Sequence, residues 1–577
     1  MTRYYIQRST NTHGDVFAVA GLAHLIDSEE EHAMIYNHGP AFAVEGRDLT
    51  HEDSRFNPLI YRYLKVDDKT KPPAGIPYYD FKERDEAEQA KRDARKEKRA
   101  SNDPEARSRI AELTADPEHY LFRAFKNMQT HKAANKILET ISGEQKEDHL
   151  AMMRKSLQAM TAPDYSELPE LKLEATGNQL VLPLSAKGIY ALKPSGTSRG
   201  NPTLDSLNDS DFLQYLRYAG YFDCAVPFES GDGLRLQVPI PHEISFGNLQ
   251  MVAAELRKTL HWGTKAKKIK LDILAALGVT RILVEHSEFA AEQDRRFEFL
   301  GKKPSQIISA LYVGYYVKTS QFGRNITELN TIAVPGWFHV NSKEDVDLWK
   351  EVLDEHQQII RNLDETHSDE ITLLLEYRQA LQLQERQALF QLITFMADYG
   401  AFWMSATSNP KRQYVPRFAT TTMERMVKSM ATDILPILQN PGFQAVSRAI
   451  RKSTVSAQAQ KAMGQKPWRE VRYGLIAEIN RKRFDKRELV ETISLFVAQY
   501  NSENARQREV KNSIEAAPAN VTTEELESLA RLIDETQDPA LVGSLLCAYG
   551  TCREPYEQES PVQSDNSAEN SENEEVC

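Results

Sequence analysis

The stretch Ser342-Lys343-Glu344-Asp345 divides this chain into two halves of different character. Ser342 is a residue type that caps helix N-termini, and an acidic residue follows three positions later, as in a capping box. Beyond it, apolar residues recur with helical spacing over residues 343–363 and again over 369–404. The sequence therefore predicts that the chain is helical after Asn341.

Shorter helices are predicted to follow these two. Their ranges are 421–439, 443–463, 468–484, 486–500, 522–534 and 539–549. Asp485 with Glu488, and Thr522 with Glu525, have the spacing of capping boxes, while Gly550 is placed to end the last helix. Because the loops between these helices are short, we expect an antiparallel bundle.

Before Ser342 the pattern changes to that of strands. In residues 234–238 (LRLQV) apolar and polar side chains alternate, and 171–175 with 180–184 have the pattern of a hairpin. Further strands are predicted at 281–284 and 329–334, with helices at 15–26 and 243–260. The expected fold class is α+β: a mixed N-terminal and central region with short sheets, then an antiparallel C-terminal helical bundle and a disordered acidic tail.

Five segments are expected along the chain. Residues 1–165 form a mixed N-terminal domain with a charged insertion at 81–107, and 166–340 form an α+β domain. Residues 341–410 are a long-helix connector, 411–555 a basic helical bundle, and 556–577 a disordered acidic tail.

The charge is distributed unevenly. The 577 residues carry a net charge of −12, but the tail 556–577 holds seven acids and no Lys or Arg, so the rest of the chain has −5. Residues 411–513 hold 20 Lys and Arg against 9 Asp and Glu. A basic segment inside an acidic chain indicates a polyanionic partner.

The sequence indicates a cytoplasmic protein. No apolar run approaches the roughly 18 residues that a membrane-spanning helix needs, and the N-terminus is too polar and aromatic for a signal peptide. The four cysteines, Cys224, Cys547, Cys552 and Cys577, include no C-x-x-C pair, so neither a disulfide framework nor a metal site is expected.

The sequence lacks the common motifs of catalysis. Neither a phosphate-binding glycine loop, a G-x-S-x-G elbow nor an H-E-x-x-H pair occurs. His51-Glu52-Asp53 and His367-Ser368-Asp369 have no second histidine at ligand spacing. We therefore expect no enzymatic activity, no cofactor and no metal.

Basic residues on both sides of Ser342 are candidates for contacts with a nucleic-acid backbone. One cluster, beside Trp262, comprises Lys265, Lys267, Lys268 and Lys270. Two predicted bundle helices carry the other candidates, which either share one side of their helix or lie at its C-terminal end. They are Arg448, Arg451, Lys452, Arg469, Arg472, Arg481, Lys482 and Arg483. Each phosphate that such cations neutralise releases counterions, which gives affinity without sequence preference. The alternative is that each cluster is an ordinary solvated face.

A Gly/Ser/Pro-rich loop at residues 193–202 is a further candidate. Lys193, Arg199 and Asn201 lie in it, and Arg and Asn are side chains that read base edges in a DNA groove. The alternative is a surface linker.

Several stretches resemble one known family. Residues 449–455 (AIRKSTV), 470–475 (EVRYGL), 500–506 (YNSENAR), 522–526 and 545–554 are similar to the C-terminal part of the large subunits of type I CRISPR surveillance complexes (Cascade). Residues 13–23 (HGDVFAVAGLA) resemble the opening of several type I-B-like large subunits, which more often carry Asp where this chain has Val19.

The resemblance implies a non-catalytic subunit of an antiviral complex guided by a crRNA. Its partners would be the backbone, handle-binding and small subunits, the crRNA and double-stranded target DNA. Such subunits help to inspect the short PAM duplex beside the target, which is the role implied for Lys193, Arg199 and Asn201, and their C-terminal bundle braces target or displaced DNA. A separately recruited helicase–nuclease, or a transposition machine, acts afterwards.

Three alternatives or extensions remain at this point. The chain could instead be an unrecognised metal-dependent nuclease, or a helical scaffold that joins only proteins. The resemblance also suggests that a small subunit is made from an internal start, at Met404 or Met423.

Overall fold

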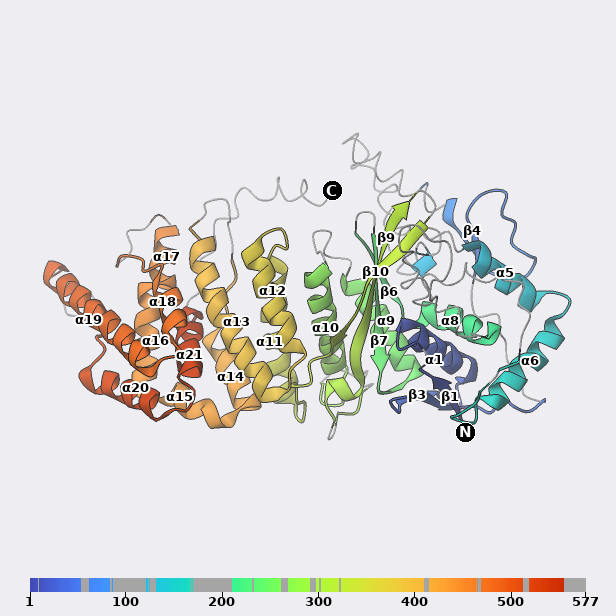
Figure 1. Ribbon diagram of the computed structural model, residues 1–577, viewed down its shortest axis with the longest axis horizontal. Coiled ribbons are helices and arrows are strands. Elements are labelled where there is room, and N and C mark those ends of the chain that lie inside the picture. Colours follow the sequence, from blue (N-terminus) through green and yellow to red (C-terminus); the bar gives the residue numbers. More distant parts are fainter. Residues whose placement is uncertain are drawn as a thin grey trace, which may run out of the picture.

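The computed structural model has a sheet-containing half and an all-helical half, arranged end to end (Figure 1). It describes residues 1–52 except 9, 62–82, 86, 121–122, 124, 131–166, 168–169, 210–230, 233–260, 268–290, 297–299, 302–320, 323–408, 415–462, 464, 469–511 and 518–554. Within these residues the predicted α+β class is confirmed. The predicted hairpin at 171–184, most of the charged insertion and the acidic tail lie outside them.

The N-terminal sheet contains strands from distant parts of the chain. Its order is β1 (Thr2–Gln7), β3 (Ala41–Gly46), β2 (Met34–Asn37) and β8 (Glu243–Ser245), and every pairing is antiparallel. Two short strands, β4 (Tyr63–Lys65) and β5 (Tyr78–Asp80), pair in parallel nearby. Because β8 pairs with β2, the expected boundary at residue 165 does not separate two independent sheets.

Helix α1 (His13–Ile26) is the buried centre of this half. It crosses α8 (Asp211–Cys224) so closely that a Cβ on Gly21 would lie 2.0 Å from the carbonyl oxygen of Leu216. A Cβ on Gly220 would lie equally close to the carbonyl oxygen of Phe17. Glycine at both positions therefore permits the contact. Val19 is fully buried, so the aspartate of the resembled family would have no access to water here.

A second sheet stands at the middle of the molecule. Its order is β10 (Gly323–Ala333), β9 (Ile308–Ser320), β7 (Gly233–Pro241) and β6 (Val226–Ser230), all antiparallel. Helix α9 (Phe246–Leu260) and α1 cover one face, and α10 (Lys268–Glu285) covers the other (Figure 1). The strands predicted at 234–238 and 329–334 are confirmed by β7 and β10.

Two predictions in this region are wrong. Residues 281–284 belong to α10, whose burial on almost every side gives it a continuous apolar run like that of a buried strand. The helix predicted from residue 243 begins only at Phe246, because the preceding residues pair as β8. The remaining elements of this half are α5 (His131–Ser142), α6 (Lys146–Ala159) and the short turn η3 (Pro304–Gln306).

The second half is helical, as predicted. The helices are α11 (Lys343–Asn362), α12 (Ser368–Leu381), α13 (Glu385–Ala406), α14 (Thr420–Met430), η4 (Thr432–Ile434), α15 (Leu435–Gln439), α16 (Pro441–Ser453), α17 (Val455–Ala462), α18 (Leu475–Lys482), α19 (Lys486–Lys511), α20 (Thr523–Glu535) and α21 (Pro539–Thr551). None of the helices in the described part of the chain is both long and apolar enough to cross a membrane.

Predicted helix ends are correct where a side chain caps the helix. Ser342 accepts from the Asp345 backbone N–H at 3.2 Å, and the capping box of Thr522 and Glu525 is present. Four predicted helices are shorter or divided: 369–404 forms α12 and α13, 421–439 forms α14, η4 and α15, 443–463 is interrupted at Thr454, and 468–484 is helical only as α18. Helix α21 continues past Gly550, where a Cβ would crowd the Ile450 side chain at 2.7 Å.

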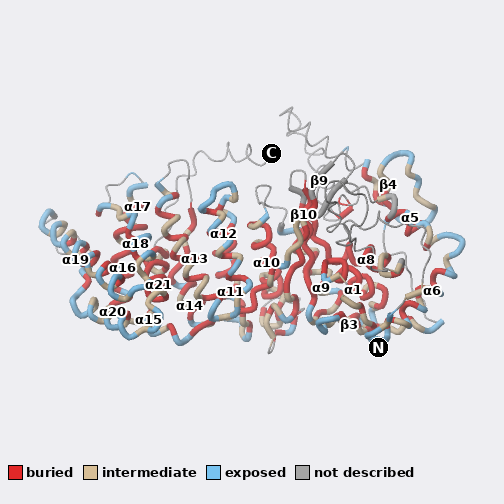
Figure 2. The backbone as a smooth tube through the Cα atoms, viewed as in Figure 1, coloured by how far each residue is buried: buried red, intermediate tan, exposed pale blue. Residues whose placement is uncertain are grey.

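The last helix returns to the start of the helical half. Helix α21 packs along α13, where a Cβ on Gly400 would lie 2.4 Å from the Thr551 hydroxyl. Just beyond it, Arg553 exchanges backbone hydrogen bonds with Phe418 and Thr420. Buried residues run through these helices (Figure 2), so the expected connector and bundle share one core across residue 410.

Candidate nucleic-acid interface

Arg451 belongs to the core, which corrects the prediction that it contacts nucleic acid. Its side chain is only 2% exposed. The guanidinium donates to the Tyr549 carbonyl at 2.7 Å and pairs with the Glu554 carboxylate. The predicted arc of basic residues does lie on α16. However, α21 and the residues after it cover the edge of that arc that holds Arg451. A phosphate therefore has no access to Arg451.

Arg469 and Arg472 precede α18 and do not lie on a helix, so their predicted common arc is wrong. The Arg469 guanidinium lies 3.8 Å from the centre of the Tyr500 ring, and burial lowers its pKa. Arg472 donates to the Gln499 side-chain oxygen at 2.6 Å and pairs with Glu503. Both arginines thus hold this loop against α19.

The described lysines of the cluster at the start of α10 also have internal roles. Lys265 and Lys267 lie outside the described residues. Lys268 is 3.4 Å from Glu328, with its ammonium 4.0 Å from the centre of the Tyr315 ring. Lys270 is buried, donates to the backbone carbonyls of Arg361 and Leu363, and has its pKa lowered by burial. The prediction that Lys270 contacts nucleic acid is therefore corrected.

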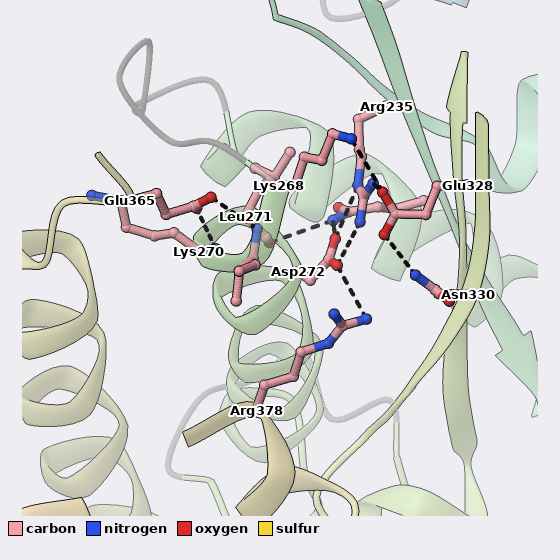
Figure 3. A network of polar contacts seen from close by, with 11 residues as sticks. Arg235, Lys268, Lys270, Leu271, Asp272, Glu328, Asn330, Glu365 and Arg378 are labelled. Atoms are coloured by element: carbon pink, nitrogen blue, oxygen red, sulfur yellow. Dashed lines mark hydrogen bonds and ion pairs between the residues drawn. The ribbon is translucent and has the colours of Figure 1, made fainter. Parts of the chain in front are cut away.

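Lys268 and Lys270 flank a buried ionic network that joins the two halves (Figure 3). Arg235 on β7 pairs with Asp272 on α10 through bonds of 2.6 and 3.1 Å. Arg378 on α12 reaches the same carboxylate at 3.5 Å. Glu365, between α11 and α12, accepts the backbone N–H groups of residues 269 and 270. The network thus fixes α10 to the first helices of the helical half.

The loop residues proposed for PAM inspection, Lys193, Arg199 and Asn201, lie outside the described residues. Arg448 on α16 is exposed and Lys452 is half-buried. Arg481, Lys482 and Arg483 lie at the end of α18. These last five predicted positions keep access to solvent.

The strongest concentration of accessible cations is the turn between α18 and α19, residues 481–487 (RKRFDKR), hereafter the basic turn. It holds five cations and one acid, Asp485, whose carboxylate accepts the Glu488 N–H at 2.9 Å and so caps α19. Arg481 and Arg487 are exposed, and within the described residues neither makes a hydrogen bond or an ion pair.

The other three cations of the basic turn have partners. Lys482 pairs with Glu478 at 3.3 Å, and Arg483 donates to the Asn480 side-chain oxygen at 3.1 Å. Lys486 donates to the Asp534 carbonyl at the end of α20. These contacts orient the turn without neutralising most of its charge.

Packing beneath the basic turn holds it in place. A Cβ on Gly543 of α21 would lie 2.7 Å from the Arg483 Cβ, so glycine lets the turn approach that helix. Leu489, one turn into α19, is fully buried. Phe484, in contrast, is 72% exposed, with the Arg483 guanidinium 5.1 Å from its ring centre.

Sequence reasoning found three of these cations and missed Phe484, Lys486 and Arg487. The signal was present as five cations in seven residues across a helix boundary. It was overlooked because a helical wheel considers one helix at a time, whereas this surface is made by the turn between two helices.

Other chemistry-bearing residues form no metal centre in the described part of the chain. No group of three or more His, Cys, Asp or Glu side chains is arranged there to hold a metal ion. The thiols of Cys224, Cys547 and Cys552 are buried, and burial raises their pKa values.

Comparison with known proteins gives no relative: no family model matches the chain, and no curated protein matches it.

Proposed function

We propose that this chain is the non-catalytic large subunit of a type I-B-like, crRNA-guided DNA surveillance complex. In this role it helps to inspect the duplex beside the target and braces target or displaced DNA, while a separately recruited effector acts on that DNA. The observation that carries the proposal is the basic turn, an accessible group of cations within the segment that resembles Cascade large subunits.

The charge distribution supports a nucleic-acid partner in particular. Arg481 and Arg487 form no ion pair with any described residue, so their charges are available to a phosphate backbone. Basic side chains at a helix N-terminus are unfavourable by roughly 0.3–1 kcal/mol each, because the helix dipole is positive there. Lys486 and Arg487 occupy the first turn of α19. An anionic partner would offset that cost.

The architecture supports a bracing role. The ionic network of Arg235, Asp272 and Arg378 ties the sheet-containing half to the helical half. A subunit that holds DNA with one half and contacts other subunits with the other needs a rigid connection of this kind, because it keeps the bound DNA in a fixed place relative to those subunits.

The test is to purify the tagged chain from its native cells and identify what accompanies it. We expect backbone and handle-binding subunits by mass spectrometry, together with RNAs of uniform length that share a constant 5′ segment. A matched preparation should carry a tag on an unrelated protein from the same cells. A chain that purifies without other proteins and without RNA of this kind would contradict the proposal.

A further inference from the structure

The basic turn includes one feature that binding to a nucleic-acid backbone does not require. Cations are sufficient to hold phosphates, but Phe484 also places a large apolar ring in water. Full burial of a Phe side chain stabilises a fold by roughly 1.5–3 kcal/mol. Among the described residues Phe484 gains little of this, although α19 buries Leu489, Ile493 and Phe496 on its inner side.

From this combination we infer that the basic turn binds an unpaired stretch of nucleic acid, with one base stacked on the Phe484 ring and adjacent phosphates on Arg481 and Arg487. Aromatic rings stack on bases of any sequence, and flanking cations follow the backbone. In a duplex the base faces are already stacked on one another, so the ring favours single strands. The inference rests on the proposed function only in taking the partner to be a nucleic acid.

Local geometry leaves one face of the ring open to such a partner. The Arg483 guanidinium lies 5.1 Å from the ring centre and is itself fixed by Asn480. Asp485, the one acid in the turn, is occupied in capping α19. Glu478 is likewise paired with Lys482. The exposed cations Arg481 and Arg487 therefore flank an aromatic ring, and Glu488 is the exposed acid next to them in the sequence.

The test measures binding of the full-length chain to a fluorescent oligothymidine, to the same strand with abasic sites, and to a duplex of equal length. Phe484→Ala should weaken binding to oligothymidine by roughly 5- to 150-fold, the range expected for loss of one base–aromatic stack. It should leave binding to the abasic strand and to the duplex unchanged. Its salt dependence should also stay the same, because stacking releases no counterions.

Arg481→Gln with Arg487→Gln should act differently. This double variant should weaken binding to all three ligands and flatten the dependence of log K on log salt by about 0.7 per lost phosphate contact on single strands. Phe484→Trp should retain binding and show quenching of its fluorescence by oligothymidine. Leu495→Ala, which removes an exposed apolar side chain within α19, is the matched control and should change nothing.

Specific results would overturn the inference. One is equal binding of oligothymidine by the wild type and Phe484→Ala; another is an equal loss on intact and abasic strands, which would mean that the ring has only a packing role. Binding of acidic peptides in preference to oligothymidine would show that the turn is a protein-docking surface. Because these measurements use the purified chain, they remain informative whether or not native complexes contain a guide RNA.

Discussion

At the scale of single residues, Glu355 on α11 is a buried acid whose protonation bears on stability. Its carboxylate accepts the Ala419 N–H at 2.6 Å and the Thr422 hydroxyl, and Arg553 is 3.9 Å away. Burial raises the pKa of Glu355 from about 4.5 to about 7. Between these two values the folded chain keeps a proton that the unfolded chain releases, so this group's contribution to stability is lost as pH rises from about 4.5 to about 7.

We therefore predict that Glu355→Gln raises the melting temperature relative to the wild type more at pH 8 than at pH 5. The amide can still accept the Ala419 N–H but carries no charge. At about 1.4 kcal/mol per tenfold change in the protonation equilibrium, the difference in free energy of unfolding should reach at most about 3 kcal/mol. Thermal melts across pH 5–8 measure it. Asp347→Asn, an exposed change on the same helix, is the control; an equal shift at both pH values would contradict the prediction.

The sequence shows where cations are concentrated in the candidate site, but not which of them are buried in the fold. The cations at residues 481–483 are visible in the sequence and remain accessible in the structure. The fate of Arg451 depends on Glu554, 103 positions away, and that of Arg469 on Tyr500, 31 positions away. A helical wheel shows which side of a helix a residue occupies, but not which distant element covers that side.

At the scale of helices, prediction succeeded where local chemistry sets an end and failed where packing does. Ser342 and Thr522 cap their helices with their own side chains, so their positions were visible in the sequence. Only Thr454 separates α16 from α17, and no glycine or proline marks this break in the sequence. In α10, the run Ile282-Leu283-Val284 is buried all round, so its periodicity did not distinguish helix from strand.

The packing of α13 leads to a prediction about an internally started product. A chain beginning at Met423 lacks α13 altogether, and one beginning at Met404 keeps only its end. Without α13, the side of α21 that holds the buried Thr551, which packs against Gly400, loses its covering helix. We predict that a 423–577 fragment alone shows no cooperative thermal transition by circular dichroism, whereas a 384–577 fragment, which retains α13, does. A sigmoidal transition for the shorter fragment would contradict this.

At the scale of the whole molecule, the connections that sequence could not foresee are those between remote segments. Strand β8 completes a sheet begun by β1, and Arg553 closes the helical half beside Phe418. Local patterns specify each strand and helix but not its partner, which explains why the fold class was predictable while the contacts across residues 165 and 410 were not.

The acidic segment 556–577 bears on the electrostatics of the whole chain. Its seven acids bring the net charge from −5 to −12, and it follows Glu554, which is held by Arg451 at the end of the bundle. Negative charge tethered to the bundle lowers the local concentration of an anionic ligand. We predict that removing 556–577 strengthens oligonucleotide binding several-fold at 0.05 M salt, as measured by fluorescence anisotropy.

The salt dependence separates this effect from a change in contacts. Charges interact over about 10 Å at 0.1 M ionic strength but only about 3 Å at 1 M, so the gain from truncation should shrink as salt is added. Truncation must spare Glu554, because its loss would leave the buried Arg451 without its carboxylate. A full-length variant in which the seven acids become Gln or Asn should bind like the truncated chain. If that variant binds like the wild type while truncation still strengthens binding, the segment acts through its bulk and not through its charge.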